Sequence, residues 1–264
     1  IVAAMVATEL QSKAKQSKAK QRESDAMDYL TYLSLGDSGW GDELLKGLAV
    51  TIGLALCALP VGLILGTGVA ALSISAHKSY RWFANVYTTV LRGLPELLTL
   101  FIIYHGVGLL INKTLKWIDP SNGFFELNPF GAGVIALGLV FSGYAAEVLR
   151  GAWKAMDKGQ REAGYSLAMT RLQIFWFIER PQLLRLALPG LGNLWINLLK
   201  DTALVSVIAL DDLMRAANIA VGATKKPFLF YLTVCLAYWA VCVCCERLLA
   251  AMEQHSKRGI RVSR

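Results

Sequence analysis

Two adjacent ionisable residues, Lys200 and Asp201, stand in a segment that is otherwise free of charge from residue 186 to residue 210. Ionisable side chains are rare inside membrane-spanning helices, and those that occur face a partner helix or a water-filled cavity. Adjacent residues of a helix do not face each other, so the two groups cannot simply pair. Either each of them bonds to another helix, or the ammonium binds a carboxylate or carbonyl and the carboxylate binds a cation.

Other residue types that could support chemistry are scattered. The histidines His77, His105 and His255 are far apart, and none has a metal-ligand partner at helical spacing. The sequence has no G-x-S-x-G segment and no GxxxxGK(S/T) phosphate-binding segment. The cysteines lie in apolar segments without a CxxC pair, where cysteine behaves as a small hydrophobic residue. We therefore predict no catalytic residue, no metal site and no bound cofactor in this chain.

Long apolar runs must position the ionisable groups. Hydrophobic residues make up 55% of the chain and charged residues 17%, below the roughly 25% usual for soluble domains. A helix needs about 20 apolar residues to cross a bilayer. Five runs meet or approach that length, so the sequence predicts an all-α, polytopic membrane protein with five transmembrane helices. The runs cover about residues 44–76, 94–112, 131–153, 186–210 and 227–248.

The loop charges indicate an orientation, because cytoplasmic loops carry an excess of Lys and Arg. The segment between the third and fourth runs holds Arg150, Lys154, Lys158, Arg161, Arg171, Arg180 and Arg185. We expect this loop, residues 154–185, and the C-terminal tail, residues 253–264, to be cytoplasmic. The N-terminus is then outside. The net charge of +8 reflects this topology and contact with anionic lipid, and it requires no nucleic acid.

The N-terminal residues 1–43 do not fit this scheme. They contain the basic tandem repeat QSKAK twice, at residues 11–20, and no signal-peptide pattern. Either Met27 is the native start, or a flexible tail is translocated. The membrane domain is expected to cover residues 44–252.

The loop at residues 154–185 has a helical pattern of its own. Apolar residues recur on one side at spacings near 3.6, at Ala163, Leu167, Ile174, Phe175 and Ile178. Gly159 is expected to break the preceding helix, and Glu162 to lie near the start of the next, where the helix dipole favours a carboxylate. Pro181 and Pro189 are expected to end or kink the helical segment beyond it. Such a helix either lies on lipid or docks a cytoplasmic partner.

Three local arrangements are interpreted as structural. Gly62 and Gly66, at GxxxG spacing, let another helix approach closely. Glu96 suits the first turn of a helix. Glu147 and Arg150 are three residues apart and are expected to form a local pair that supports the loop.

Five short segments in a fixed order carry a resemblance. They are LRGLP at residues 91–95; Tyr144, Glu147, Arg150 and Gly151; GQREA at residues 159–163 with Pro181 beyond it; ALPG at residues 187–190; and KDTAL at residues 200–204. Together they resemble the ABC importer permeases of polar amino acids, the branch for histidine, lysine, arginine, ornithine and opines. GQREA resembles the EAA loop of these permeases, which holds the helix that couples them to the ATPase. The likeness covers roughly residues 44–261.

The resemblance implies a type I ABC importer permease fold and a subunit that imports polar amino acids, with basic amino acids or opines expected. It implies a dimer of ATP-binding subunits that hold ATP and Mg, a second homologous permease or a copy of this chain, a periplasmic substrate-binding protein, and a bacterial inner membrane. The implied residues are Gly159, Glu162, Ala163, Gly164 and Ala168 for ATPase coupling, and Lys200, Asp201 and Thr202 for the substrate path. A secondary transporter or channel subunit is the alternative, but it would predict inverted repeats, and none is evident.

The coupling segment departs from the family pattern at two positions. The family's EAA reads Glu162, Ala163 and Gly164 here, and Ala168 stands where the family has glycine. Each exchange replaces one small residue with another, so a closely packed contact with a partner can survive. Gly164 costs a helix up to about 1 kcal/mol.

Overall fold

The computed structural model describes residues 31–36, 39–118 and 127–257, and these residues form helices and no strand. The predicted all-α class is confirmed. The tandem repeat at residues 11–20, Met27 and the last residues, 258–264, lie outside the described residues.

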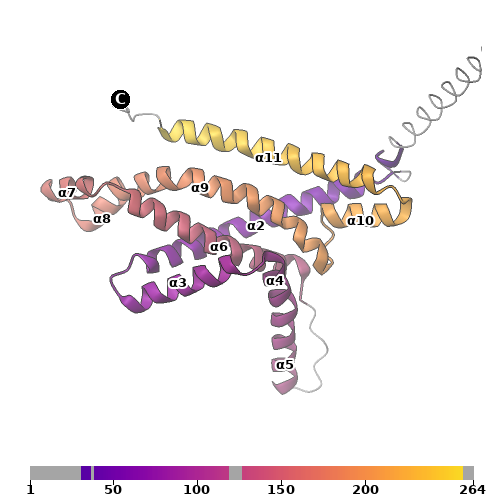
Figure 1. Cartoon of the computed structure of the whole chain (residues 1–264), viewed down its shortest axis with the longest axis horizontal. Coiled ribbons are helices and arrows are strands. Elements are labelled where there is room, and N and C mark those ends of the chain that lie inside the picture. Colours follow the sequence, from indigo (N-terminus) through magenta and orange to yellow (C-terminus); the bar gives the residue numbers. More distant parts are fainter. Residues whose placement is uncertain (1–30, 37–38, 119–126, 258–264) are drawn as a thin grey trace, which may run out of the picture.

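Four long helices run along one another and form the bundle (Figure 1). They are α2 (Gly41–Ser73), α6 (Pro129–Ala155), α9 (Arg180–Asp201) and α11 (Pro227–Lys257). Helix α2 packs on α6, α6 packs on α9, and α9 packs on α11.

Length and composition allow four of the described helical segments to cross a membrane. These are α2, α6, the segment Glu96–Ile118, and α11 from Pro227 to Gln254. The remaining predicted run, the fourth along the chain at residues 186–210, falls on α9 and the 3₁₀ helix η3 (Thr202–Ile208). Helix α9 lies beside α6 and α11, so it belongs to the bundle by position.

Glycines allow the close approach of α2 to α6. A Cβ atom on Gly62 would lie 2.5 Å from Cδ1 of Phe141 and 2.9 Å from the carbonyl oxygen of Gly138. A Cβ atom on Gly66 would lie 3.0 Å from the carbonyl oxygen of Ser142. The interpretation of these two glycines as a helix-packing pair is confirmed. Helix α2 also continues through Pro60 without ending.

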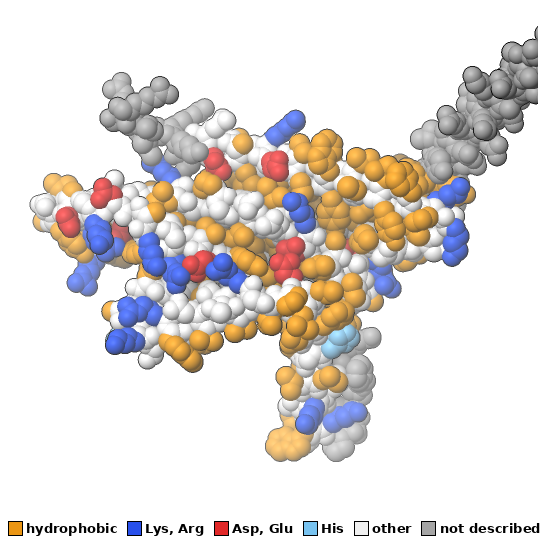
Figure 2. Space-filling model, in the orientation of Figure 1, with side chains coloured by type: hydrophobic (Ala, Val, Ile, Leu, Met, Phe, Trp, Pro, Cys, Tyr) orange, Lys and Arg blue, Asp and Glu red, His pale blue; other side chains and the backbone are white. Residues whose placement is uncertain are grey.

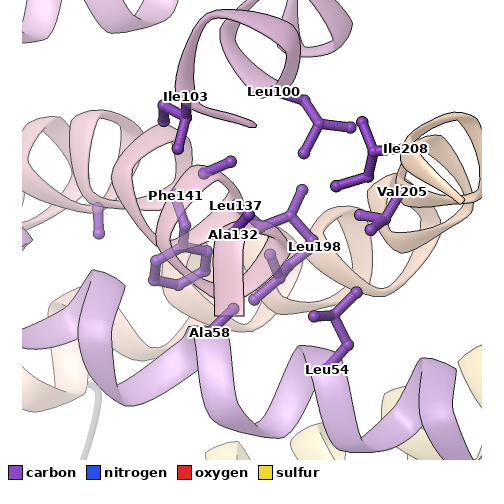
Figure 3. Packing of buried hydrophobic residues seen from close by; sticks show 12 residues of the cluster. Leu54, Ala58, Leu100, Ile103, Ala132, Leu137, Phe141, Leu198, Val205 and Ile208 are labelled. Carbon is purple, nitrogen blue, oxygen red and sulfur yellow. The ribbon is translucent and has the colours of Figure 1, made fainter. Parts of the chain in front are cut away.

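The main core lies where α2, α6, α9 and η3 meet α4 (Glu96–Phe101), as Figure 3 shows. Its buried side chains include Leu54, Ala58, Leu100, Ile103, Ala132, Leu137, Phe141, Leu198, Val205 and Ile208. Lipid is as apolar as this core, so close packing rather than exclusion of water holds such helices together.

A break at Leu94 and Pro95 separates α3 (Lys78–Gly93) from α4. Helix α3 packs on α2 and α6. Leu94 has an extended backbone with ψ of 140°, as expected for a residue before proline. The break redirects the chain between Arg92, in the last turn of α3, and Glu96, in the first turn of α4.

After α4 the chain leaves the bundle as an arm, which consists of the π-helical turn η1 (Ile102–Val107) and α5 (Gly108–Ile118) (Figure 1). Helix α5 packs mainly on η1. Leu110, Trp117 and Ile118 remain exposed, Trp117 with 86% of its surface. Hydropathy alone does not reveal that this apolar segment points away from the other helices.

Helix α10 (Leu213–Thr224) lies at the end of the bundle opposite α7 (Lys158–Ser166), as Figure 1 shows. Asp212 caps α10, because its Oδ1 accepts the backbone N–H of Arg215 at 2.9 Å. The Asp212 side chain is fully buried, and its Oδ2 has no hydrogen bond among the described residues. Burial, which disfavours the charged form, raises the pKa of Asp212 to about 6.

Candidate functional site

A cavity of about 200 Å³ opens between α4, α6 and α9. Its polar wall comes from Glu96, Tyr144, Asn197, Lys200 and Asp201. The remaining wall is apolar and consists of Leu137, Val140, Phe141, Leu194 and Leu198. Charged groups from the first turn of α4 and the last turn of α9 thus meet inside the bundle.

The Glu96 and Asp201 side chains line the same cavity, close enough for their carboxyl groups to interact electrostatically. Two carboxylates at such a distance repel each other unless a proton or a cation lies between them. Lys200 lines the same cavity and supplies an ammonium group. The cavity therefore suits a solute that carries both a cationic group and a carboxylate.

The structure separates the three residues that the sequence suggests for a substrate path. Lys200 and Asp201 line the cavity, whereas Thr202 does not. Thr202 is fully buried, donates to the carbonyl of Leu199 at 2.7 Å, and lies 3.4 Å from the hydroxyl of Tyr238 on α11.

Glu96 is the charged cavity residue that the sequence interpretation missed, because it was assigned only to a helix start. Glu96 does lie in the first turn of α4, but its side chain also lines the cavity together with Asp201. The available signal was that Glu96 is the one carboxylate in the apolar run at residues 94–112.

The loop at residues 154–185 begins with α7. The Asp157 side chain caps this helix, because its Oδ1 accepts the N–H of Gly159 at 2.9 Å. Gly159 therefore lies in the first turn of α7, and the expectation that it breaks a helix is wrong. The interruption falls at Met156 and Asp157, between the end of α6 and the start of α7.

A tight turn then separates α7 from α8 (Arg171–Ile174). Thr170 and Gln173 form a capping box that starts α8. Between the two helices, Ala168 has a φ of 57°, in the left-handed region that favours glycine. An alanine there costs about 1–2 kcal/mol. The residue that replaces the family's glycine thus occupies a position where the backbone conformation favours glycine.

This turn also divides the apolar stripe expected along one helix. Ile174 is buried, whereas Leu167 is 76% exposed. The expectation of a single stripe from Ala163 to Ile178 is wrong, because the chain reverses between its two halves.

The inner face of α7 is fixed to the bundle. Arg161 pairs with the buried Glu179 of the π-helical turn η2 (Phe175–Glu179), and its guanidinium lies 5.4 Å from the ring centroid of Trp153 on α6. Gly164 is buried, and a Cβ atom there would lie 2.9 Å from Cδ1 of Ile178. Gly164 therefore lets α7 sit close to η2.

The outer face of α7 is open to a partner. Glu162, Ala163, Tyr165 and Leu167 are exposed. Glu162 forms no ion pair with any described residue. Figure 2 shows Lys and Arg side chains gathered at this end of the bundle. This surface combines apolar contact area with charges that a protein partner can recognise.

Comparison with known proteins places these features in a family. The family described as "Binding-protein-dependent transport system inner membrane component" matches residues 58–258. The chain is 38% identical over 235 residues to the octopine transport system permease protein OccQ of Rhizobium radiobacter, which covers 89% of this chain and 99% of that protein. It is 37% identical over 226 residues to the arginine ABC transporter permease protein ArtQ of Escherichia coli (strain K12), with coverage of 81% and 95%.

A solved structure agrees with these matches. A crystal structure of an amino acid ABC transporter with histidines superposes with a TM-score of 0.71 at 32% identity, and the match covers 82% of this chain and 95% of that chain. The predicted type I ABC importer permease fold is confirmed. The segment that matches the family contains both the cavity and the α7–α8 loop. The chain therefore belongs to the family of binding-protein-dependent transport system inner membrane components, and it is a permease subunit of an ABC importer.

Proposed function

We propose that this permease imports basic amino acids or opines and that the Glu96–Asp201 cavity holds the cationic group of the solute. Two carboxyl groups that line one cavity inside a membrane domain carry this proposal, because a bound cation relieves their repulsion. Lys200 is placed to pair with the solute carboxylate. The similar proteins named for octopine and arginine transport support a solute of this class.

The proposed assembly contains two of these bundles, formed either with a second homologous permease or with another copy of this chain. Two ATP-binding subunits, which hold ATP and Mg, dock on the outer face of α7 through Gly159, Glu162 and Ala163. Gly164 and Ala168 shape that surface from behind. A periplasmic substrate-binding protein delivers the solute at the opposite end.

The same proposal sets the orientation in the inner membrane. The Lys and Arg side chains at the α7–α8 end support a cytoplasmic location for that end and for the C-terminus. The N-terminus is then periplasmic, as the charges of the loops predict.

The coupling route in this proposal runs through two helices. Helix α7 follows the end of α6 directly, and the Arg161–Glu179 pair fixes it to the turn before α9. Helices α6 and α9 also supply the cavity wall, through Tyr144, Lys200 and Asp201. A displacement of α7 by the ATPase subunits therefore reaches the cavity as rigid movement of packed helices.

The proposed function is tested by uptake into vesicles that contain the complete importer. Labelled arginine, lysine, histidine, octopine and nopaline are compared with glutamate, with and without ATP. ATP-dependent accumulation of at least one cationic solute, and none of glutamate, is the expected result. Accumulation of acidic solutes alone would refute the assignment of the cavity to a cationic group.

The Asp201→Asn variant is expected to reduce the preference for cationic solutes. Removing one carboxylate takes away about half of the negative charge beside the solute, and we expect the arginine-to-glutamine uptake ratio to fall about tenfold. Competition between the two labelled amino acids measures this ratio.

Asp211→Asn is the matched control, because Asp211 is 85% exposed and pairs with Arg215 outside the cavity. Surface ion pairs of this kind contribute little to stability. Equal preference in Asp201→Asn and in the unmodified chain would place the selectivity elsewhere in the importer.

A further inference from the structure

A second charged network joins α3 to α6. Glu147 pairs with Arg150 of its own helix at 2.8 Å and with Arg92 of α3 at 3.7 Å. Arg150 also donates to Oδ1 of Asn85 on α3 at 2.8 Å. The expected local pair of Glu147 and Arg150 is confirmed, but the sequence does not indicate that the pair extends to α3.

This network lies within the length of the bundle rather than at its end. Helix α6 continues for eight residues beyond Glu147, to Ala155, which corresponds to about 12 Å. The side chains of Arg92, Glu147 and Arg150 are 43%, 34% and 26% exposed. Ionisable groups at such a depth face a water-filled cavity or a protein partner, because lipid would not solvate them.

Tyr144 connects the network to the cavity. It lines the cavity wall, and the Arg92 guanidinium lies 5.6 Å from the centroid of its ring. Glu147 follows Tyr144 by three residues, so the two side chains share one face of α6. Figure 2 shows charged side chains along the bundle from the α7–α8 end toward the base of the arm. The network therefore begins at the wall of the cavity that faces α7.

The two sites differ in their balance of charge. The network contains two guanidinium groups and one carboxylate, whereas the cavity contains two carboxyl groups and one ammonium. Along α6, the basic group of residues lies between the acidic group and α7.

We propose that Arg92 and Arg150, held by Glu147, form a cationic barrier that retains a cationic solute in the cavity until α3 and α6 separate. This inference rests on the proposed function. The contacts from Glu147 to Arg92 and from Arg150 to Asn85 cross between helices, so relative movement of α3 and α6 breaks them. The barrier would then open when the loop at residues 154–185 displaces α6.

The test measures leakage through the complete importer in proteoliposomes without ATP. Labelled arginine is compared with labelled histidine at pH 8, where the imidazole is mostly neutral. Arg92→Gln is expected to raise the arginine leak about tenfold and to leave the histidine leak within about twofold, because only the charge barrier is lost. Arg92→Lys, which keeps the charge, is expected to restore the low arginine leak.

Lys113→Gln is the matched control, because it removes one positive charge from the exposed surface of α5, away from the network. It is expected to leave both leaks unchanged. Equal rises of the arginine and histidine leaks in Arg92→Gln would overturn the proposal, since they would mean that the network only seals the packing. No rise in a variant that still hydrolyses ATP would overturn it as well.

Glu147→Gln provides a second test if Arg92→Gln does not assemble. It leaves both guanidinium groups without a carboxylate, so the ratio of arginine to histidine in ATP-driven uptake at pH 8 is expected to fall about tenfold. An unchanged ratio contradicts the barrier. If the wild-type importer takes up no cationic solute, the proposed function is wrong. If the wild-type importer takes up a cationic solute and the variants behave like it, only the barrier is wrong.

Discussion

Replacing Glu162 with arginine is expected to abolish ATP-driven uptake while the permease still folds. Glu162 is exposed on the outer face of α7 and has no ion pair among the described residues, so the change costs the isolated subunit no more than about 0.5 kcal/mol. At a docked interface, a reversed charge costs at least about 2 kcal/mol, or roughly 30-fold in affinity. Co-purification of the ATP-binding subunits and uptake of arginine measure the two effects together.

Glu43→Arg makes the same exchange in the first turn of α2, which lies at the other end of the bundle. It is expected to leave the ATP-binding subunits attached. Glu162→Gln removes the charge without adding bulk. Its co-purification of ATP-binding subunits and its uptake of arginine are expected to lie between those of the wild type and of Glu162→Arg. Normal attachment and normal uptake in Glu162→Arg would show that the ATPase contacts another part of the loop.

Replacing Gly62 with valine is expected to give the largest loss of stability of any single change considered for this chain. The new Cβ atom would lie 2.5 Å from the ring of Phe141 and 2.9 Å from the carbonyl oxygen of Gly138. The ring can rotate, but the backbone of α6 cannot yield without moving the helix. We expect a cost of about 2–3 kcal/mol, typical of overpacking in a dense core. Thermal unfolding of the purified subunit in detergent measures it.

Gly68→Val is the matched control on the same helix. A Cβ atom at Gly68 would meet no described atom within 4 Å. The same substitution is therefore expected to change the free energy of unfolding by no more than about 0.5 kcal/mol. Similar destabilisation by both variants would mean that valine disturbs α2 itself, and that the contact with α6 is not the cause.

The parts of the structure that depend only on local periodicity were predictable. Long apolar runs predict helices in lipid, and α2, α6 and α11 lie where the runs indicate. The spacing of Gly62 and Gly66 predicts a close helix contact, and the spacing of Glu147 and Arg150 predicts their pair. Each of these inferences needs only residues that are neighbours on one helix.

The parts that depend on how helices cross were not predictable. Nothing in the segments around Glu96 and Asp201 indicates that these residues line one cavity, because that depends on the packing of α4 against α6 and α9. The turn at Ala168 was not predictable from the sequence for a different reason. Its left-handed backbone has no glycine to signal it, and the apolar residues on either side continue in phase with a helix. Neither the shared cavity nor the turn can therefore be read from the local sequence pattern.

The arm limits what an unfolding experiment on the single subunit reports. Helix α5 packs mainly on η1 and leaves Leu110, Trp117 and Ile118 exposed, so the rest of the bundle supplies little of its stability. The segment Glu96–Ile118 is long and apolar enough to cross a membrane, where a helix satisfies its own backbone hydrogen bonds. The helical state of the arm therefore depends on its apolar surroundings. A midpoint of unfolding measured in detergent reports the detergent around the arm as well as the packing of the bundle.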